Sequence, residues 1–315
     1  MTHPPLHPMA QALLDRQAAS GEPPMETLTA QQARAIADVR VLRATFARRE
    51  GITTREVEAP GPHGPVPIRL YRPEGAAPDA LLPVLVYLHG GGMVVGNRDT
   101  VDPHCRWLCA ELGCMVASVE YRLAPEHRFP IGTEDALAAV TWLGAQAKAL
   151  GGDAHRLAIS GESSGGTLTA SVCLGLRDAG SALKPTLQVL VYPGMDSVLE
   201  GEAWERLGEG YFLTRPKMQW FVDHYLTAEQ ALDPRASPVR AKDFHGLPPA
   251  LVITAGYDPL VDGGRHYADQ LAAAGVPVHY HCFEEWPHGY FYWAESSAAQ
   301  ETMRMFVDAV RASWQ

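Results

Sequence analysis

The chain has 315 residues, of which 46% are hydrophobic, and it carries a formal net charge of −10. This length and composition can build the core of one large domain or of two small ones. The acidic balance leaves no basic patch, so we expect no nucleic-acid partner and no stable membrane association. No stretch of the sequence reaches the length of a membrane span.

Cysteine usage and the first residues indicate a cellular compartment. Five cysteines, an odd number in a long chain, favour free thiols in a reducing environment. The N-terminal residues lack the basic segment and apolar core of a signal peptide, so we expect a cytoplasmic protein. A metal site formed by His104, Cys105, Cys109 and Cys114 is the alternative use of these thiols. We interpret residues 103–113 instead as an amphipathic helix with packed cysteines, and we expect no metal.

The predicted elements begin with helices in residues 8–49, where Thr29 and Gln32 have capping-box spacing ahead of the second helix. Two β-rich segments, 53–59 and 66–72, flank a Pro/Gly-rich turn and predict an antiparallel pair. Strands and helices then alternate. Further helices are predicted at 134–149, 166–179, 263–274 and 297–312. Such alternation indicates an α/β fold with a mostly parallel central sheet and helices on both faces.

A glycine cluster follows the first buried strand of this alternation, residues 83–88. His89, Gly90, Gly91 and Gly92 stand there in a row. Three adjacent glycines cost backbone entropy, so a fold keeps them where side chains must be absent. Backbone N–H groups that stabilise an oxyanion have this requirement. We therefore predict Gly91 and Gly92 as oxyanion donors and His89 as a residue that fixes the loop; a flexible surface loop is the alternative.

The most informative segment is residues 161–166, Gly-Glu-Ser-Ser-Gly-Gly, between an apolar strand and a helix. This layout is typical of a nucleophile elbow, a sharp turn that lifts Ser163 clear of the sheet and needs small neighbours such as Gly161 and Gly165. The turn also places Ser163 at a helix N-terminus, where the N–H of Ser164 becomes a third predicted oxyanion donor. A phosphate-binding loop is the alternative, but no Gly-Lys-Ser/Thr follows.

An acid and a histidine follow in the order that such a serine requires. Asp258 comes just after the apolar run 249–255, at the strand end where ligand sites of open α/β sheets gather. Asp262 competes with it, but lies deeper in the next segment and can begin a helix. His288 stands between Pro and Gly in the loop after the predicted last strand. We interpret the other candidate histidines as structural or without catalytic context: His224, His245, His266, His279 and His281.

Together these residues predict acyl transfer by a serine triad. His288 removes the Ser163 hydroxyl proton as Ser163 attacks an ester carbonyl, and Asp258 holds the imidazole tautomer. The N–H groups of the glycine loop and of Ser164 meet the oxyanion. Neither a metal nor an organic cofactor is needed for this chemistry.

With these motifs in order, the chain resembles the bacterial hormone-sensitive-lipase family of carboxylesterases. The resemblance spans most of the chain. The segments that carry it are residues 89–92, 121–126, 161–166, 258–260 and 288–290. It implies an α/β-hydrolase fold with a helical cap, acting on small-molecule esters of short or medium acyl chains. It also implies that residues 121–126 form a structural turn with Arg122 and Glu126 paired. Similar proteins often pair as homodimers through the C-terminal part of the sheet, and the oligomeric state stays open.

The chain departs from the family pattern at a few positions without losing a reacting group. Met93 replaces the usual aromatic residue, Tyr290 replaces Phe, and Glu162 and Ser164 stand where Asp and Ala are usual. Ser164 still offers its backbone N–H, whereas the thioether of Met93 changes the predicted pocket wall. These differences affect substrate preference more than the reaction.

The remaining helix-rich segments define the predicted domain organisation. Residues 1–50 and 197–232 lie outside the alternating core, and we assign both to the cap. Residues 51–196 and 233–315 then form the catalytic core. Some aromatic residues of the second cap segment are expected to line the pocket, but the sequence does not say which.

Three other functions are consistent with parts of this pattern. A peptidase or amidase would use the same triad, although the sequence offers no large gating module. A true lipase would act on emulsified long-chain substrates. A catalytically silent ligand-binding receptor would require a broken triad, yet Ser163, Asp258 and His288 all have the required type.

Overall fold

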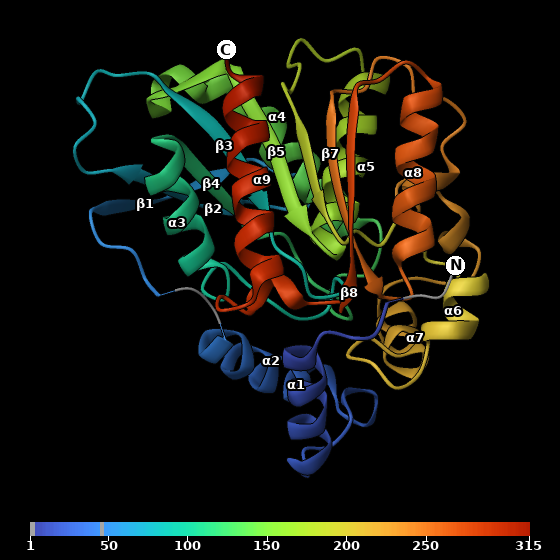
Figure 1. The fold of residues 1–315 in the computed structure, drawn as a ribbon. Helices are drawn as coiled ribbons and strands as arrows, with labels where there is room; N and C mark the ends of the chain where they lie inside the picture. The colour runs from blue at the N-terminus through green and yellow to red at the C-terminus, as the bar shows by residue number, and fades with distance from the viewer. Residues whose placement is uncertain (1–3, 45–46) are drawn as a thin grey trace.

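The computed structural model describes residues 4–44 and 47–315 (Figure 1). Within these ranges the strands form one eight-stranded sheet in the order β1-β2-β4-β3-β5-β6-β7-β8. The antiparallel pairing predicted for segments 53–59 and 66–72 is confirmed as β1 with β2; β2 also runs antiparallel to β4, and the other pairs are parallel. The strands are β1 Ile52–Ala59, β2 Val66–Pro73, β3 Leu82–Leu88, β4 Met115–Val119, β5 Gly152–Glu162, β6 Gln188–Val191, β7 Ala250–Tyr257 and β8 Val278–Pro287.

Helices cover both faces of the sheet, α3 and α9 on one face and α4, α5 and α8 on the other (Figure 1). Strand β3 shows why the sheet needs helices on both faces. Val84 and Val86 pack into the core on the side of α4 and α5, whereas Leu85 and Tyr87 pack on the side of α3 and α9. Successive side chains point to opposite faces, so a continuous apolar strand needs cover on both. The predicted α/β fold is confirmed.

The bounds of these helices agree with the predicted ones to within three residues. They are α3 Asp102–Leu112, α4 Ile131–Leu150, α5 Ser164–Asp178, α8 Val261–Ala273 and α9 Ser297–Ser313. In the described part of the chain, no helix is both long enough and apolar enough to cross a bilayer.

Further helices lie outside the layers, beyond the carboxyl ends of the parallel strands (Figure 1). Their bounds are α1 Pro8–Ala19, η1 Met25–Thr27, α2 Ala30–Ala44, α6 Glu202–Leu207, α7 Arg215–Tyr225, η2 Gln230–Leu232 and, nearby, η3 Pro238–Arg240. The predicted capping box is confirmed: the Thr29 N–H donates to Gln32 Oε1 at 3.0 Å, and the Gln32 N–H donates to Thr29 Oγ1 at 3.3 Å. Residues 45–46, part of the predicted N-terminal helical stretch, lie outside the described residues.

The predicted pairing of Arg122 with Glu126 is wrong. Arg122 donates Nη1 to the buried Asp135 carboxylate at 2.6 Å, and Glu126 pairs with Arg34 at 2.6 Å. Arg34 also donates Nε to the Val94 carbonyl oxygen at 2.8 Å. Residues four apart face each other in a helix, but this segment is a turn, so the two side chains reach different neighbours.

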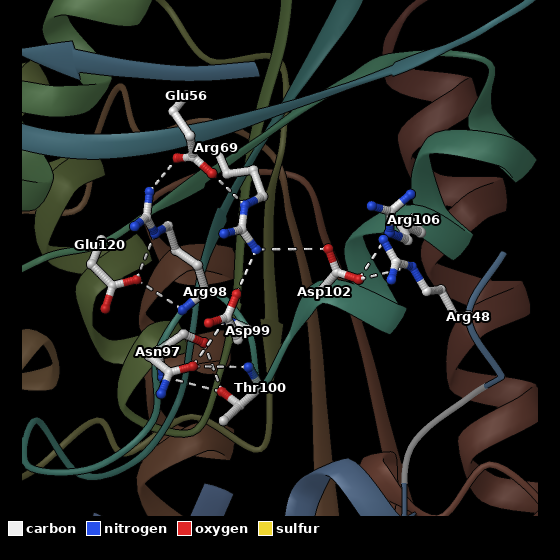
Figure 2. Close-up of polar contacts among 10 residues, drawn as sticks. All are labelled: Arg48, Glu56, Arg69, Asn97, Arg98, Asp99, Thr100, Asp102, Arg106 and Glu120. Carbon is white, nitrogen blue, oxygen red and sulfur yellow. Dashed lines mark hydrogen bonds and ion pairs between the residues drawn. The ribbon is translucent and has the colours of Figure 1, made fainter. Parts of the chain in front are cut away.

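A charged network fixes the loop that leaves the glycine cluster (Figure 2). Arg98 pairs with Glu120 at 2.9 Å and also with Glu56. Arg69 pairs with Glu56 at 2.6 Å and with Asp99 at 2.7 Å. Since Glu56 lies on β1 and Arg69 on β2, these contacts hold the loop against the antiparallel edge of the sheet.

Asp102 joins this network to α3. Substituting it tests how much the network contributes to the stability of the fold. Its Oδ2 accepts from Arg106 Nε at 2.8 Å (Figure 2). Because Arg106 is buried, removing the charge leaves a buried guanidinium without its carboxylate. We expect Asp102→Asn to lower the free energy of unfolding by about 2 kcal/mol, measured by urea denaturation. Asp178→Asn is the control, because Asp178 is 64% exposed in its pair with Arg177; equal losses in both variants would contradict this role.

Candidate active site

The turn between β5 and α5 carries Ser163 at its apex. Ser163 has φ 55° and ψ −122°, a backbone conformation that side-chain-bearing residues rarely adopt. A Cβ atom on Gly161 would overlap the backbone of Gly165, and one on Gly165 would overlap the carbonyl oxygen of Leu88. Strand and helix therefore approach as closely as predicted for a nucleophile elbow, and only glycine fits at these two positions.

The structure brings the three predicted triad side chains into one relay. Ser163 Oγ lies 3.0 Å from His288 Nε2, and His288 Nδ1 lies 2.7 Å from Asp258 Oδ2. The Asp258 side chain is 1% exposed, and its other oxygen accepts from the N–H of Leu260 at 2.9 Å. The carboxylate is thereby oriented from one side by the backbone, and the imidazole is oriented by the carboxylate.

The sheet explains this convergence. Ser163 follows β5, Asp258 follows β7, and His288 follows β8. Parallel strands end at the same edge, so loops that are distant in sequence meet there. Between β5 and β7 lies β6, and Tyr192, which follows it, packs its ring 4.6 Å from the His288 ring.

The competing candidates lie elsewhere in the structure. Asp262 is at the start of α8, where its carboxylate accepts from the Ala203 N–H at 3.1 Å. His279 and His281 are in β8, and His266 is in α8. The cysteines of α3 pack in the core, where burial raises the pKa of Cys109 to about 12. In the ranges 4–44 and 47–315, no group of three or more His, Cys, Asp or Glu could hold a metal ion.

The glycine cluster forms a tight loop beside Ser163. Gly91 has φ 123° and Gly92 has φ 60°, and a Cβ atom on Gly91 would overlap the carbonyl group of Val95. The Gly91 carbonyl oxygen accepts from the N–H of Val95 at 2.9 Å, which closes the turn. Gly91, Gly92 and Ser164 line the same cavity as Ser163. Ser164 is the first residue of α5, so its N–H has no acceptor within the helix.

His89 and Gly90 lie at the base of this loop. His89 Nδ1 lies 2.8 Å from the Gly90 carbonyl oxygen, and the His89 ring stacks on Tyr121 with 4.4 Å between centroids. The Tyr121 hydroxyl donates to the His89 carbonyl oxygen at 2.5 Å. The histidine thus contacts its own loop through Gly90 and packs against Tyr121.

A cavity of about 200 Å³, partly open to solvent, lies over Ser163 and His288. Its walls are mainly apolar. Met25 from η1 contributes to them, together with Leu213 and with Met218 and Phe221 of α7. The Phe221 ring packs on Gly92 so closely that a Cβ atom there would overlap it. The cavity is therefore bordered by the N-terminal segment and by α7 as well as by the glycine loop.

Sequence reasoning missed several of the cavity residues, and Met25 and Tyr192 are two examples. Met25 belongs to a short 3-10 helix without a local signal, and only tertiary packing brings it to the site. Tyr192 does follow a buried strand at the carboxyl edge of the sheet, which is a signal that could have been used.

Comparison with known proteins gives the family to which this fold and this site belong. The chain belongs to the family described as alpha/beta hydrolase fold, whose model matches residues 85–292. It is 43% identical over 214 residues to an ethyl acetate hydrolase of Pseudomonas putida, a match that covers 68% of this chain and 67% of that one. It is 39% identical over 245 residues to the carboxylic ester hydrolase LipN of Mycobacterium tuberculosis, covering 76% of this chain and 64% of that one.

Solved structures of esterases and alpha/beta hydrolases also resemble this chain. A thermostable esterase from Pseudomonas putida has a TM-score of 0.94 at 31% identity, covering 100% of this chain and 99% of that one. An alpha/beta hydrolase enzyme from the metagenome of Lake Arreo has a TM-score of 0.90 at 39% identity, covering 98% and 97%. The predicted resemblance and the predicted enzyme class, the carboxylic ester hydrolases, are confirmed by these relatives.

Proposed function

We propose that this protein is a serine carboxylesterase that forms an acyl-enzyme on Ser163. The observation that carries the proposal is the continuous relay from Ser163 Oγ through His288 to the buried Asp258. In the first half-reaction His288 takes the Ser163 proton, Ser163 attacks the ester carbonyl, and His288 then protonates the leaving alcohol. In the second, His288 activates water, which releases the acid.

The oxyanion of both tetrahedral intermediates is proposed to bind the N–H groups of Gly91, Gly92 and Ser164. Removing one such donor from an acyl-transfer enzyme typically costs about 3 kcal/mol of transition-state stabilisation. Two observations support this assignment: both glycines have a positive φ and line the cavity, and Ser164 lies at a helix start, where its N–H has no acceptor within the helix.

The proposed substrates are esters of short to medium acyl chains. The cavity is apolar and confined by residues of α7, and one relative is an ethyl acetate hydrolase. We expect the highest kcat/KM for one of the three shorter p-nitrophenyl esters: acetate, butyrate or octanoate. The kcat/KM for the palmitate ester should be lower by at least about tenfold. Faster cleavage of aminoacyl anilides would favour the amidase alternative, and a rise on emulsified triglyceride would favour the lipase.

Phe221 is the proposed wall that limits the size of the substrate. Its ring covers Gly92 and borders the cavity. We expect Phe221→Ala to raise the ratio of kcat/KM for octanoate to that for acetate by roughly tenfold, because the deleted ring opens space beside the oxyanion loop. Phe212→Ala is the matched control, since Phe212 packs on Trp293 instead. An unchanged ratio in Phe221→Ala would contradict the assignment.

The proposed cap consists of residues 1–50 and 197–232, and the proposed core of residues 51–196 and 233–315. In support, both cap segments border the cavity, and Trp220 Nε1 donates to the Leu28 carbonyl oxygen at 3.1 Å across them.

We further propose a cytoplasmic location, consistent with five free cysteines. A homodimer that pairs along the edge strand β8 remains a proposal, which light scattering of the purified protein would test.

A further inference from the structure

Glu162, the residue before Ser163, is a buried carboxyl that the mechanism above does not use. It is the last residue of β5 and is 0% exposed. Its Oε1 accepts the N–H of Gly90 at 2.5 Å and also accepts from the hydroxyl of Tyr292. One oxygen atom thus connects three parts of the site: the turn of Ser163, the glycine loop and the segment after His288.

The contact with the glycine loop is close and specific. A Cβ atom on Gly90 would lie 2.8 Å from the Glu162 backbone oxygen and 2.9 Å from its Oε1. The Gly90 carbonyl oxygen is held on its other side by His89 Nδ1 at 2.8 Å. Both ends of this residue are therefore fixed, and the next two residues are the proposed oxyanion donors Gly91 and Gly92.

The surroundings of Glu162 favour an uncharged carboxyl. Among the residues that the structure describes, no Lys, Arg or His forms an ion pair with it, and its Oε2 is buried without a hydrogen-bond partner. Burial accordingly raises the pKa of Glu162. An ionised carboxylate here would lose its hydration with only the Gly90 N–H and the Tyr292 hydroxyl to replace it, and its charge would repel the oxyanion that develops beside Ser163.

We propose that Glu162 is a positioning residue that aims the oxyanion loop at Ser163. It does so by accepting the Gly90 N–H, which sets the orientation of the following two peptide groups. Tyr292 completes the arrangement by fixing the carboxyl from the side of the His288 loop. This inference rests on the proposed function, because it assigns a role in the same acyl transfer.

Two substitutions of Glu162 test whether the reaction needs its hydrogen-bond acceptor or its charge. Glu162→Gln keeps an oxygen acceptor for Gly90 and Tyr292 but can never be ionised, so we expect kcat for p-nitrophenyl butyrate within about threefold of the wild type. Glu162→Leu removes the acceptor at similar size, and we expect kcat to fall by at least about thirtyfold while KM changes by less than about threefold. Affinity for a trifluoromethyl ketone, which mimics the oxyanion, should fall in parallel with kcat in Glu162→Leu.

One further variant is a control outside this contact, and a second tests the contact itself. Thr169→Val removes a buried hydroxyl from α5, where Thr169 Oγ1 donates to the Gly165 carbonyl oxygen at 2.9 Å, and should leave kcat within about threefold. Tyr292→Phe removes one of the two bonds to Oε1 and should lower kcat by about three- to tenfold.

Several outcomes would overturn the proposal. Full kcat in Glu162→Leu would exclude a positioning role, and a loss in Glu162→Gln as large as in Glu162→Leu would show that a charged carboxylate is required. If Glu162→Leu does not fold, Glu162→Gln and Tyr292→Phe still decide, since wild-type kcat in Tyr292→Phe or a thirtyfold loss in Glu162→Gln contradicts it. Failure of the proposed function is distinct, because Ser163→Ala would then retain activity whatever the Glu162 variants do.

Discussion

Replacing Ser163 with alanine should lower kcat for p-nitrophenyl butyrate by a factor of about 10⁴ or more. The hydroxyl is the sole group in the relay that can bond to the acyl carbon, and His288 alone can only assist attack by water. Alanine keeps the turn compact, so the loss should occur without unfolding. The measurement is a steady-state assay together with the thermal unfolding midpoint of each protein.

Ser160→Ala is the matched control for this substitution. Ser160 lies on β5, the strand that leads to Ser163, and donates its hydroxyl to the Val86 carbonyl oxygen at 3.0 Å, but it is buried. Its replacement should cost about 1 kcal/mol of stability and leave kcat near that of the wild type. A fluorophosphonate should label Ser163 in this control and fail to label the Ser163→Ala protein. Turnover by Ser163→Ala at the wild-type rate would end the assignment.

Asp258→Asn should have the second-largest effect, with kcat lower by a factor of roughly 10³ to 10⁴. The carboxylate accepts the proton on His288 Nδ1, which leaves Nε2 free to take the proton of Ser163. An amide NH₂ in that place donates instead, so the imidazole turns to the wrong tautomer and Nε2 cannot act as a base. The measurement is kcat across a range of pH, because the loss should persist wherever the wild type is active.

Asp262→Asn is the control that separates the two candidate acids. Asp262 accepts a backbone N–H at the start of α8 and is not in contact with the imidazole. Its substitution should keep kcat within about threefold of the wild type and cost about 1 kcal/mol of stability at most. The reverse pattern, with Asp262→Asn inactive and Asp258→Asn active, would transfer the acid role to Asp262.

The parts of the site that were predictable are those that short sequence patterns define. The elbow around Ser163 needs glycines at fixed offsets between a strand and a helix, and these constraints are local. Asp258 and His288 could be placed because each follows a recognisable strand, and parallel strands end at one edge of the sheet. The structure puts these side chains in contact, while their catalytic roles stay predictions until the variants are assayed.

The parts that were not predictable depend on which surfaces meet in three dimensions. Arg122 pairs with Asp135 rather than with Glu126, because the turn around residue 122 faces α4. Met25 reaches the cavity only through the packing of η1 against α7. Glu162 was recognised only as a departure from the family pattern, since nothing in its neighbours indicated that its carboxyl would meet Gly90. Spacing along a chain says little about contacts across separate elements.

The strand order has a consequence for biosynthesis. The glycine loop lies in the first half of the chain and Ser163 near its middle, but His288 follows β8, the final strand, which forms one border of the sheet. A growing polypeptide therefore carries Ser163 before His288, its proposed base, has been translated. In the proposed mechanism, a newly made molecule stays inactive towards esters until its last strand has docked and has brought His288 to Ser163.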